Sequence, residues 1–390
     1  MNSIELLDII KCGETSTVQF KREIDSDDSI AAEMIAFSNS KGGIIVFGVE
    51  DKKGMVNGLD YSQLQTYSNR ISAIANDKVK PQIFIFTEVI TISVENEDKK
   101  ILVVQISEGI YKPYKDKNGS IWIKQGSDKR RLTDNNEMAR LFQQSGIVYI
   151  DEMIVPNTSV SDIDKNKFNV YVNQSLKITQ KNATVYKKNL YQNLNVIRDS
   201  KLTLGGLLFF AKNPQKFRPA LCTKAISYFG ISVGGLNYRD SRDIKGTIMD
   251  MFDESMLFFK QNLKLVQKGR NFNKPGIMEI SEIALIEILQ NAFVHRDYSK
   301  NAPIRLMIFD DRIEIVSPGC LPNSLTVENI KVGNAVVRNN LISSYCSKLM
   351  NYKGFGSGIV RAIEQQPNIE FINNVEGEQF IVKIPREQIL

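Results

Sequence analysis

In the last third of the chain, a carboxylate and an amide precede a glycine-rich segment. Glu287 and Asn291 stand four positions apart, so they share one face of the helix that the apolar spacing predicts there. An amide oxygen is a hard ligand that suits Mg²⁺, and a carboxylate can orient or deprotonate a water molecule. Gly354, Gly356 and Gly358 alternate directly before a second expected helix, where backbone N–H groups favour an anion such as a polyphosphate. Taken alone, Glu287 could be a surface carboxylate and the glycines could form a turn that starts a helix. The two features together point more specifically to a nucleotide site than either does alone.

The first third of the chain holds a second group of candidate residues. Glu50 and Asp51 follow an apolar strand expected over 44–49, where they either cap a turn or belong to a site. Residues 112–131 contain seven Lys or Arg and two Asp, with aromatic residues between them. This composition suits phosphate contacts and base stacking, but a solvated loop between two strands would also show it. The basic residues expected to contact nucleic acid there are Lys124, Lys129, Arg130 and Arg131.

The overall composition narrows the class of protein. With 390 residues, of which 42% are hydrophobic and 24% charged, the chain is expected to form two or three globular domains. It has no apolar run of transmembrane length and no signal-peptide pattern at its N-terminus, so we expect a cytoplasmic protein without membrane contact. Four dispersed cysteines and a single histidine, His295, argue against a zinc site. A net charge of +6 does not by itself require a nucleic-acid partner.

The candidate residues require elements that position them. The order of expected helices and strands predicts a multidomain fold of the α/β and α+β classes. We expect an α/β domain over 1–146, a mixed α+β region over 147–270, and a two-layer α/β sandwich over 271–390.

The C-terminal part resembles the GHKL-type ATPase fold, in the divergent form found at the C-terminus of RecG-like proteins. The matching text is "ALIEILQNAFVHRDYS", "DDRIEIVSPGCLP", "VRNN" and "GFGSGIVRAI". This resemblance implies that Asn291 holds Mg²⁺ and that Glu287 is the hydrolytic base for ATP. It also implies that Gly354, Gly356 and Gly358 line the phosphates.

The same resemblance assigns further residues to recognition of the adenine base and to a lid over the nucleotide. The family contacts the adenine amino group through an Asp-x-Gly motif; here Ser317 replaces the Asp, and Gly319 matches the glycine. Arg338 would lie in the lid over the nucleotide, unless it is a solvated helix residue. His295 and Arg296 either reach phosphate or form hydrogen bonds within the fold.

The N-terminal part, 1–146, is similar to the Schlafen-type AlbA-like domain, a nucleic-acid-binding module. The matching text is "GETSTVQFKREI", "AAEMIAFSNSKGGIIVFGVEDKKGMVNG" and "IWIKQGS". The nuclease branch carries three carboxylates that form a metal site. Glu14 matches the first and Asp51 the last, but Gln19 stands at the second position. Glutamine keeps an oxygen and loses the charge, which weakens two-metal chemistry, and Lys21 stays available for a phosphate.

Together the resemblances imply a protein that binds DNA or RNA and carries a domain for ATP and Mg²⁺. They imply a role in transcriptional regulation or phage defence, and a homo-oligomer. A second hypothesis is a nuclease that uses Mg²⁺ or Mn²⁺ held by Glu14, Asp51 and Glu50. A third is a structural assembly protein in which both sites are vestigial.

Overall fold

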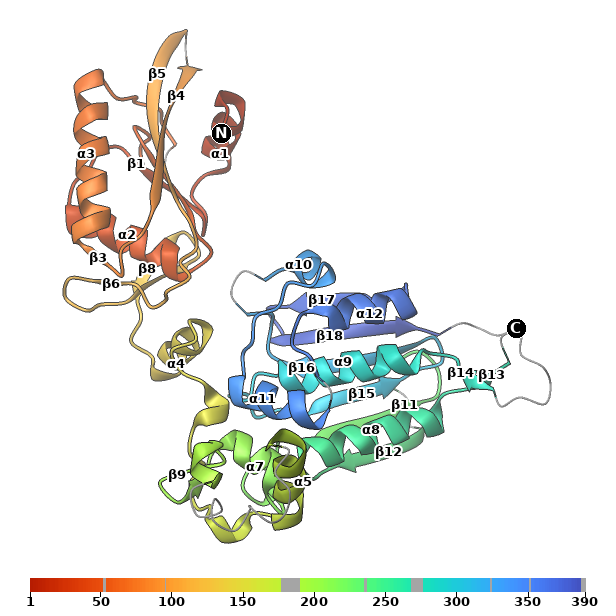
Figure 1. The fold of residues 1–390 in the computed structure, drawn as a ribbon. Helices are drawn as coiled ribbons and strands as arrows, with labels where there is room; N and C mark the ends of the chain where they lie inside the picture. The colour runs from red at the N-terminus through yellow and green to blue at the C-terminus, as the bar shows by residue number, and fades with distance from the viewer. Residues whose placement is uncertain are drawn as a thin grey trace. The chain divides into compact units, whose positions relative to one another are not determined.

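The computed structural model describes residues 1–51, 54–94, 96–176, 190–234, 237–267, 276–322, 325–350 and 352–386. The chain divides into two compact units, Met1–Val148 and Tyr149–Leu390. Both units mix helices with β-sheet, which confirms the predicted multidomain α/β class (Figure 1). No helix in the described ranges combines the length and apolar character that a membrane span requires.

The first unit is built on a four-stranded sheet. Its order is β1 (Val18–Lys21), β2 (Gly43–Phe47), β5 (Glu97–Ile106) and β4 (Ile85–Val94). β1 and β2 are parallel, and the other two pairs are antiparallel. As the unbroken apolar run of β2 predicted, side chains on both of its faces are buried: Ile45 and Phe47 join one core, and Ile44 and Val46 the other.

Three helices supply the other halves of these two cores. α1 (Ser3–Cys12) packs on one face of the sheet, and α2 (Asp27–Asn39) and α3 (Tyr61–Asp77) lie on the other (Figure 1). Two short ladders and a further helix complete the described part of the unit. They are β3 (Val79–Lys80) with β6 (Lys115–Asp116), the hairpin of β7 (Trp122–Gln125) and β8 (Asp128–Arg131), and α4 (Asn135–Gln144).

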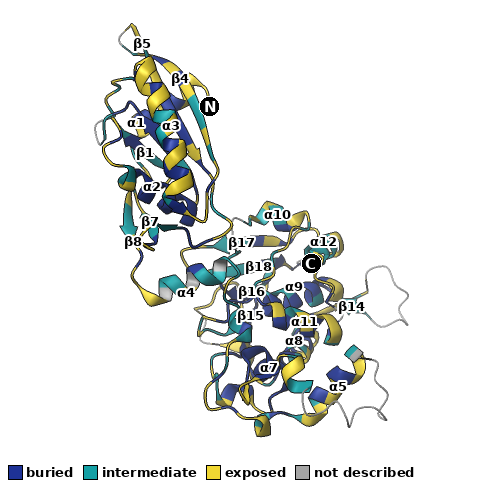
Figure 2. Cartoon of the chain, turned by 60° about the vertical axis from the view of Figure 1, so that its left-hand side comes forward, coloured by how far each residue is buried: buried dark blue, intermediate teal, exposed yellow. Residues whose placement is uncertain are grey.

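The second unit contains a six-stranded sheet covered on one face by helices. The sheet order is β12 (Tyr238–Ile244), β11 (Thr223–Tyr228), β15 (Ile304–Ile308), β16 (Arg312–Pro318), β18 (Gln379–Pro385) and β17 (Glu370–Asn374). α8 (Ile248–Asn262), α9 (Glu282–Val294) and α12 (Ser357–Gln365) lie along the sheet in Figure 1. Their buried faces form one apolar core with it, seen as dark blue in Figure 2.

Eleven further elements lie in the described part of this unit. They are η1 (Ile150–Glu152), η2 (Val160–Asp162), α5 (Lys165–Leu176), β9 (Ile197–Arg198), β10 (Lys201–Leu202), α7 (Leu204–Phe210), η4 (Pro214–Lys216), β13 (Leu265–Val266), β14 (Ile277–Met278), α10 (Val327–Lys331) and α11 (Asn340–Leu349).

The boundary that we expected at 270/271 needs correction, although these two residues lie outside the described ones. β11 precedes that boundary and β15 follows it, yet the two strands pair in parallel from Thr223 with Ile304 to Ser227 with Ile308. Splitting the chain there would leave the inner edges of both strands without hydrogen-bond partners. The expected middle region therefore contributes strands to the C-terminal sheet.

Candidate functional site

α9 presents the predicted carboxylate and amide on one of its faces. Ser281 caps its first turn, and Leu285 and Leu289 are fully buried in the core. Glu287 and Asn291 instead line a cavity beside the sheet. The four-residue spacing thus places both polar side chains toward the same space.

The glycine-rich segment closely approaches both α9 and the backbone that follows α10. Gly356 has a φ of +74°, and a Cβ there would lie 1.8 Å from the carbonyl oxygen of Gly333. A Cβ on Gly358 would lie 2.6 Å from Oε2 of Glu287. Glycine is therefore required at position 356, whereas a Cβ at position 358 would have to displace the end of the Glu287 side chain. α12 thus begins directly beside the Glu287 carboxylate.

One cavity collects predicted residues from three separate segments of the chain. They are Glu287 and Asn291 of α9, Ser317 and Gly319 at the end of β16, and Gly354, Gly356 and Gly358 around the start of α12. Much of the remaining wall is apolar and includes Ile288, Ile315, Phe371, Phe380 and Val382. An apolar cavity with a few convergent polar groups is the usual form of a small-molecule site.

Arg361, which the sequence analysis missed, holds the Glu287 carboxylate. Its Nε and Nη2 lie 2.8 and 2.7 Å from Oε1 of Glu287, and its Nη1 donates to Ser357 Oγ at 2.7 Å. The position of Arg361 four residues after Ser357 could have placed it on the same face of α12. In this arrangement the guanidinium neutralises the carboxylate that we expected to act as a base.

Asn291 is oriented by its own helix. Its Nδ2 donates to the carbonyl oxygen of Glu287 at 2.7 Å. The amide oxygen has no hydrogen-bond donor within the described ranges, and it remains an acceptor for a cation. The residues therefore fit Mg²⁺ at Asn291, whereas the Glu287 side chain is occupied by Arg361.

Two further predictions in this region have different outcomes. Ser317 lines the cavity, and its hydroxyl donates to the carbonyl oxygen of Ala292 at 3.0 Å. Arg338 does not line the cavity: its guanidinium donates to the carbonyl oxygens of His295 at 3.0 Å and Cys320 at 2.5 Å. The expectation that Arg338 lies in a lid over the nucleotide is thus not supported, because its donors already brace the backbone around Gly319.

His295 and Arg296 form their hydrogen bonds within the fold. The imidazole Nε2 lies 2.9 Å from the hydroxyl of Tyr352. Burial, together with the nearby Arg338 charge, lowers the pKa of His295 to about 4, so the ring is neutral. Arg296 is buried and donates to the carbonyl oxygens of Lys300 and Ala302. Of the two alternatives, the structure favours the internal one.

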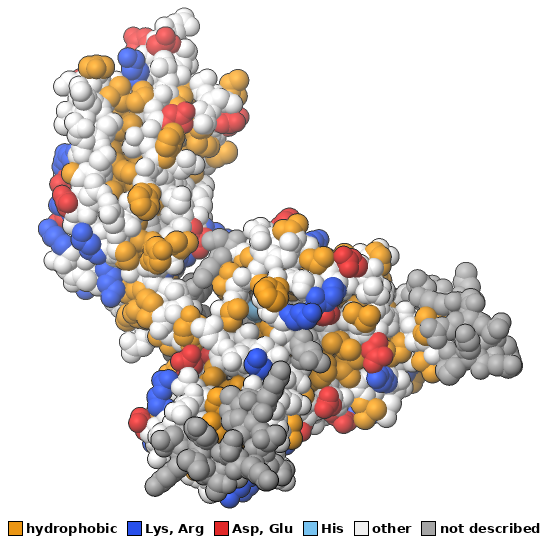
Figure 3. All heavy atoms as spheres, viewed as in Figure 1, with side chains coloured by type: hydrophobic (Ala, Val, Ile, Leu, Met, Phe, Trp, Pro, Cys, Tyr) orange, Lys and Arg blue, Asp and Glu red, His pale blue; other side chains and the backbone are white. Residues whose placement is uncertain are grey.

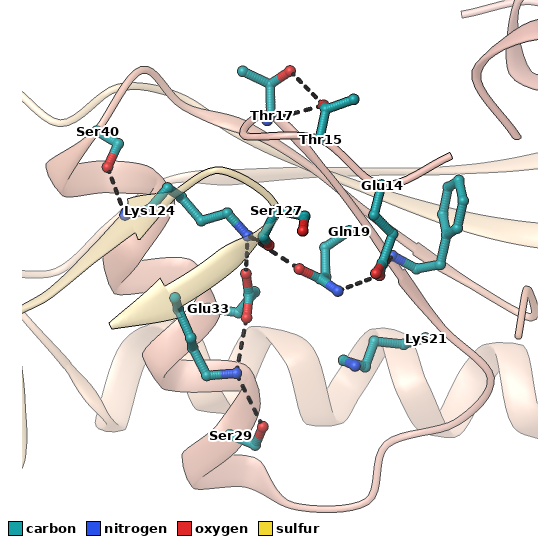
Figure 4. Close-up of polar contacts among 12 residues, drawn as sticks. Glu14, Thr15, Thr17, Gln19, Lys21, Ser29, Glu33, Ser40, Lys124 and Ser127 are labelled. Atoms are coloured by element: carbon teal, nitrogen blue, oxygen red, sulfur yellow. Dashed lines mark hydrogen bonds and ion pairs between the residues drawn. The ribbon is translucent and has the colours of Figure 1, made fainter. Parts of the chain in front are cut away.

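In the first unit, a chain of polar contacts links β1, β7 and α2 (Figure 4). Glu14 accepts from Nε2 of Gln19, and Oε1 of Gln19 accepts from the ammonium of Lys124 at 3.0 Å. Lys124 also lies 2.7 Å from Oε1 of Glu33, whose Oε2 is 2.8 Å from Lys129. We call these five residues the Lys124 network.

The expected three-carboxylate site is not assembled as the resemblance implies. Glu14 contacts Gln19, but Asp51 forms an ion pair with Lys21. Glu50 is partly buried at the end of the same strand region. Within the described ranges, no group of three or more Asp, Glu, His or Cys side chains is arranged to hold a metal ion.

Four of the five basic residues expected to contact nucleic acid have internal partners. Lys124 has a side chain that is only 1% exposed, so it cannot reach a phosphate, and that prediction is corrected. Lys129 pairs with Glu33, and Lys21 with Asp51, while Arg130 lies 2.6 Å from Glu137. Arg131 is exposed and has no acidic partner among the described residues.

A basic pair that the sequence analysis did not single out lies on a short ladder. Lys80 of β3 stands directly opposite Lys115 of β6. Neither ammonium has an acidic partner among the described residues, whereas the nearby exposed Lys117 lies 3.3 Å from Asp28. On the face shown in Figure 3, basic side chains collect at the end of the first unit that carries β3 and β6. The register of two short strands creates this pair, which is why sequence spacing alone did not show it.

Comparison with known proteins finds three matching families. Residues 14–133 match "Schlafen, AlbA_2", and residues 301–383 match "Putative ATP-dependent DNA helicase recG C-terminal". Residues 139–220 match "Domain of unknown function (DUF8451)". No curated protein matches the chain.

Among solved structures, the chain is similar to the DIP2311 protein from Corynebacterium diphtheriae. The two are 17% identical with a TM-score of 0.45, over 95% of this chain and 65% of that chain. This chain therefore spans 65% of the length of that relative. The matched families bear out the architecture that the motifs predicted: a Schlafen AlbA_2 segment toward the N-terminus and a RecG-like C-terminal segment.

Proposed function

We propose that the second unit binds a nucleoside triphosphate with Mg²⁺ and that the first unit binds DNA or RNA. The observation that carries the first half is the single cavity in which Asn291, Ser317 and three glycines converge. These residues come from distant segments of the chain and meet on one apolar cavity, which is the usual form of a small-molecule site. The match of residues 301–383 to a RecG C-terminal family supports the same reading.

Each group in the cavity has a definite part in binding. Backbone N–H groups around Gly356 and Gly358, at the start of α12, would face the phosphates, because an anion is favoured at a helix N-terminus. The amide oxygen of Asn291 would hold Mg²⁺, which supplies positive charge to neutralise the phosphates when it is bound. The apolar wall would receive the base.

Hydrolysis is the weaker part of this activity. Oε1 of Glu287 accepts two N–H groups from Arg361, so only Oε2 stays available to take a proton from water. The second unit is therefore proposed to act chiefly as a nucleotide-binding unit whose turnover is slow.

Thermal unfolding with ATP and Mg²⁺ tests the nucleotide site. At a hundredfold excess over Kd, a ligand stabilises the folded state by about 2.7 kcal/mol, which corresponds to a rise in Tm of several degrees. Asn291→Ala should abolish the part of this rise that depends on Mg²⁺. The control Asn166→Ala, at an exposed position of α5, should keep it. A wild-type Tm that ATP and Mg²⁺ leave unchanged would refute the site.

Lys80 and Lys115 support polynucleotide binding by the first unit. Lys80 Nζ donates to the carbonyl oxygen of Asn76 at 3.1 Å, and Lys115 Nζ lies 5.9 Å from the centroid of the Phe142 ring. Neither ammonium is neutralised by a carboxylate among the described residues, so both retain positive charge for a phosphate. Exposed Arg131 adds positive charge to the same unit. The match of residues 14–133 to the Schlafen AlbA_2 family supports this reading.

The salt dependence of binding tests this second half. The double substitution Lys80→Glu and Lys115→Glu should weaken binding to all sequences and make the slope of log K against log salt shallower by about 2. The double substitution Lys165→Glu and Lys348→Glu, an equal charge change at exposed positions of α5 and α11, should leave both quantities unchanged. An unaltered affinity for the double variant would count against these lysines.

The cellular role and the assembly of the chain follow as proposals. Transcriptional regulation would require preferred duplex sites, whereas phage defence would require a protective effect during infection, and a deletion strain tests both. We also propose a homo-oligomer, which light scattering of the full chain would measure.

A further inference from the structure

The ammonium of Lys124 occupies a complete cage inside the first unit. It lies 2.7 Å from Oε1 of Glu33 and 3.0 Å from Oε1 of Gln19, and it also donates to the carbonyl oxygen of Ser127. An ammonium group has three N–H donors, so these three acceptors satisfy it fully. The ring of Phe37, with its centroid 4.9 Å away, adds a cation–π contact. Lys124 is thus held as a bound cation would be held.

Gln19 has a part in this cage that a carboxylate could not fill. Its amide N–H donates to Glu14 while its amide oxygen accepts from Lys124. A glutamate at position 19 would have no donor for Glu14 and would set two negative charges side by side. The glutamine is therefore the residue type that can bridge an anion and a cation.

Lysines also neutralise the neighbouring acids. The two oxygens of Glu33 are divided between Lys124 and Lys129, at 2.7 and 2.8 Å. Asp51 is paired with Lys21. A divalent ion would have to displace these ammonium groups before it could reach Glu33 or Asp51.

We infer that Lys124 is the resident cation of the first unit and stands in place of a divalent metal ion, so that the carboxylates around it form no nuclease site. The residues present do not fit the two-metal chemistry that the nuclease hypothesis requires, because its carboxylates are bridged by an amide or paired with lysines. This inference is independent of the nucleotide cavity, and it holds whether or not the first unit binds a polynucleotide.

Electron paramagnetic resonance of Mn²⁺ tests the inference on the full chain. We would use the Asn291→Ala background without nucleotide, so that the second unit contributes no ion. The spectrum should show no Mn²⁺ bound at Glu14 or Asp51. Neither Glu14→Gln nor Asp51→Asn should therefore change the amount of bound Mn²⁺. One Mn²⁺ per chain that either substitution releases would overturn the inference.

A second variant tests the cage itself. Lys124→Met removes the ammonium and leaves the oxygens of Glu33, Gln19 and Ser127 around its place. Mn²⁺ at tenfold above its Kd should then raise the Tm of the first unit by about 4 °C. Lys129→Met keeps the cage filled and should show no such rise. A folded Lys124→Met variant that Mn²⁺ does not stabilise would overturn the inference, and if this variant does not fold, the resonance experiment decides.

Discussion

Replacing Glu33 with glutamine should destabilise the first unit strongly. The Glu33 side chain is 2% exposed, and each of its oxygens serves a lysine: Lys124, which is 1% exposed, and Lys129, which is 23% exposed. Glu33→Gln keeps the shape of the side chain and removes its charge. Lys124 would then stay buried with no anion beside it, and removing one partner of a buried ion pair costs about 3–5 kcal/mol.

The single tryptophan lets this loss be measured for the first unit alone. Trp122 lies on β7, two residues before Lys124, and donates from Nε1 to Asp116 at 3.1 Å. Its fluorescence during urea unfolding therefore gives the free energy of unfolding of this unit. A loss of about 3 kcal/mol would also lower its Tm by roughly 6–12 °C, given the size of the unit.

Glu137→Gln is the matched control for this experiment. Glu137 lies 2.6 Å from Arg130, but these side chains are 38% and 35% exposed. Exposed ion pairs contribute about 0–1 kcal/mol, so the same chemical change should have little effect there. If Glu33→Gln costs less than about 1 kcal/mol, or no more than Glu137→Gln, the claim that Glu33 holds a buried cation is refuted.

Two further predictions concern the second unit. Arg361→Ala should free Glu287 and raise the rate of ATP hydrolysis at saturating ATP, and a rate equal to wild type would show that Arg361 does not restrain the carboxylate. The pH dependence of stability should reflect two buried groups with opposite effects. Burial raises the pKa of Asp151 from 3.8 to about 6, so its contribution to stability is present below pH 3.8 and is lost as the pH rises through 6. Burial lowers the pKa of His295 from 6.5 to about 4, so its contribution is present above pH 6.5 and is lost as the pH falls through 4. Between pH 6.5 and 4, Asp151→Asn should therefore make the unit lose stability on acidification, and His295→Gln should make it gain. Hydrogen exchange of the α11 amides measures how the stability of each variant changes with pH. Equal slopes of stability against pH in the two variants would contradict the opposite effects assigned to Asp151 and His295.

Local patterns in the sequence predicted the parts of the fold that depend on near neighbours. The apolar run of β2 predicted burial on both faces, and the spacing of Glu287 and Asn291 predicted a shared helix face. The steric demand for Gly356 and Gly358 agrees with a glycine segment that approaches another element closely. Each of these inferences uses residues that lie within one helix, strand or turn.

Pairs that form across the fold were beyond sequence reasoning. Arg361 reaches Glu287 over a separation of 74 residues, and Lys124 reaches Glu33 over 91. The sequence gives the charges of these side chains but not which one meets which. The expectation that Lys124 faces solvent failed for this reason, because its surroundings are set by the docking of β7 on α2.

Two lysine pairs in the first unit show how the same local pattern leads to different roles. Lys124 and Lys129 stand directly opposite each other on β7 and β8, as Lys80 and Lys115 do on β3 and β6. Like charges directly opposite each other destabilise a ladder, and an anion beside them relieves this cost. The first pair has one inside the fold, since Glu33 gives one oxygen to each lysine. The second pair has no carboxylate among the described residues: Lys80 donates to the carbonyl oxygen of Asn76, and Lys115 lies over the Phe142 ring, so its charge is not cancelled within the described part of the unit. A phosphate of a bound polynucleotide would there take the part that Glu33 takes inside the unit, which is why we place the nucleic-acid contact on β3 and β6 rather than on the hairpin that the composition suggested.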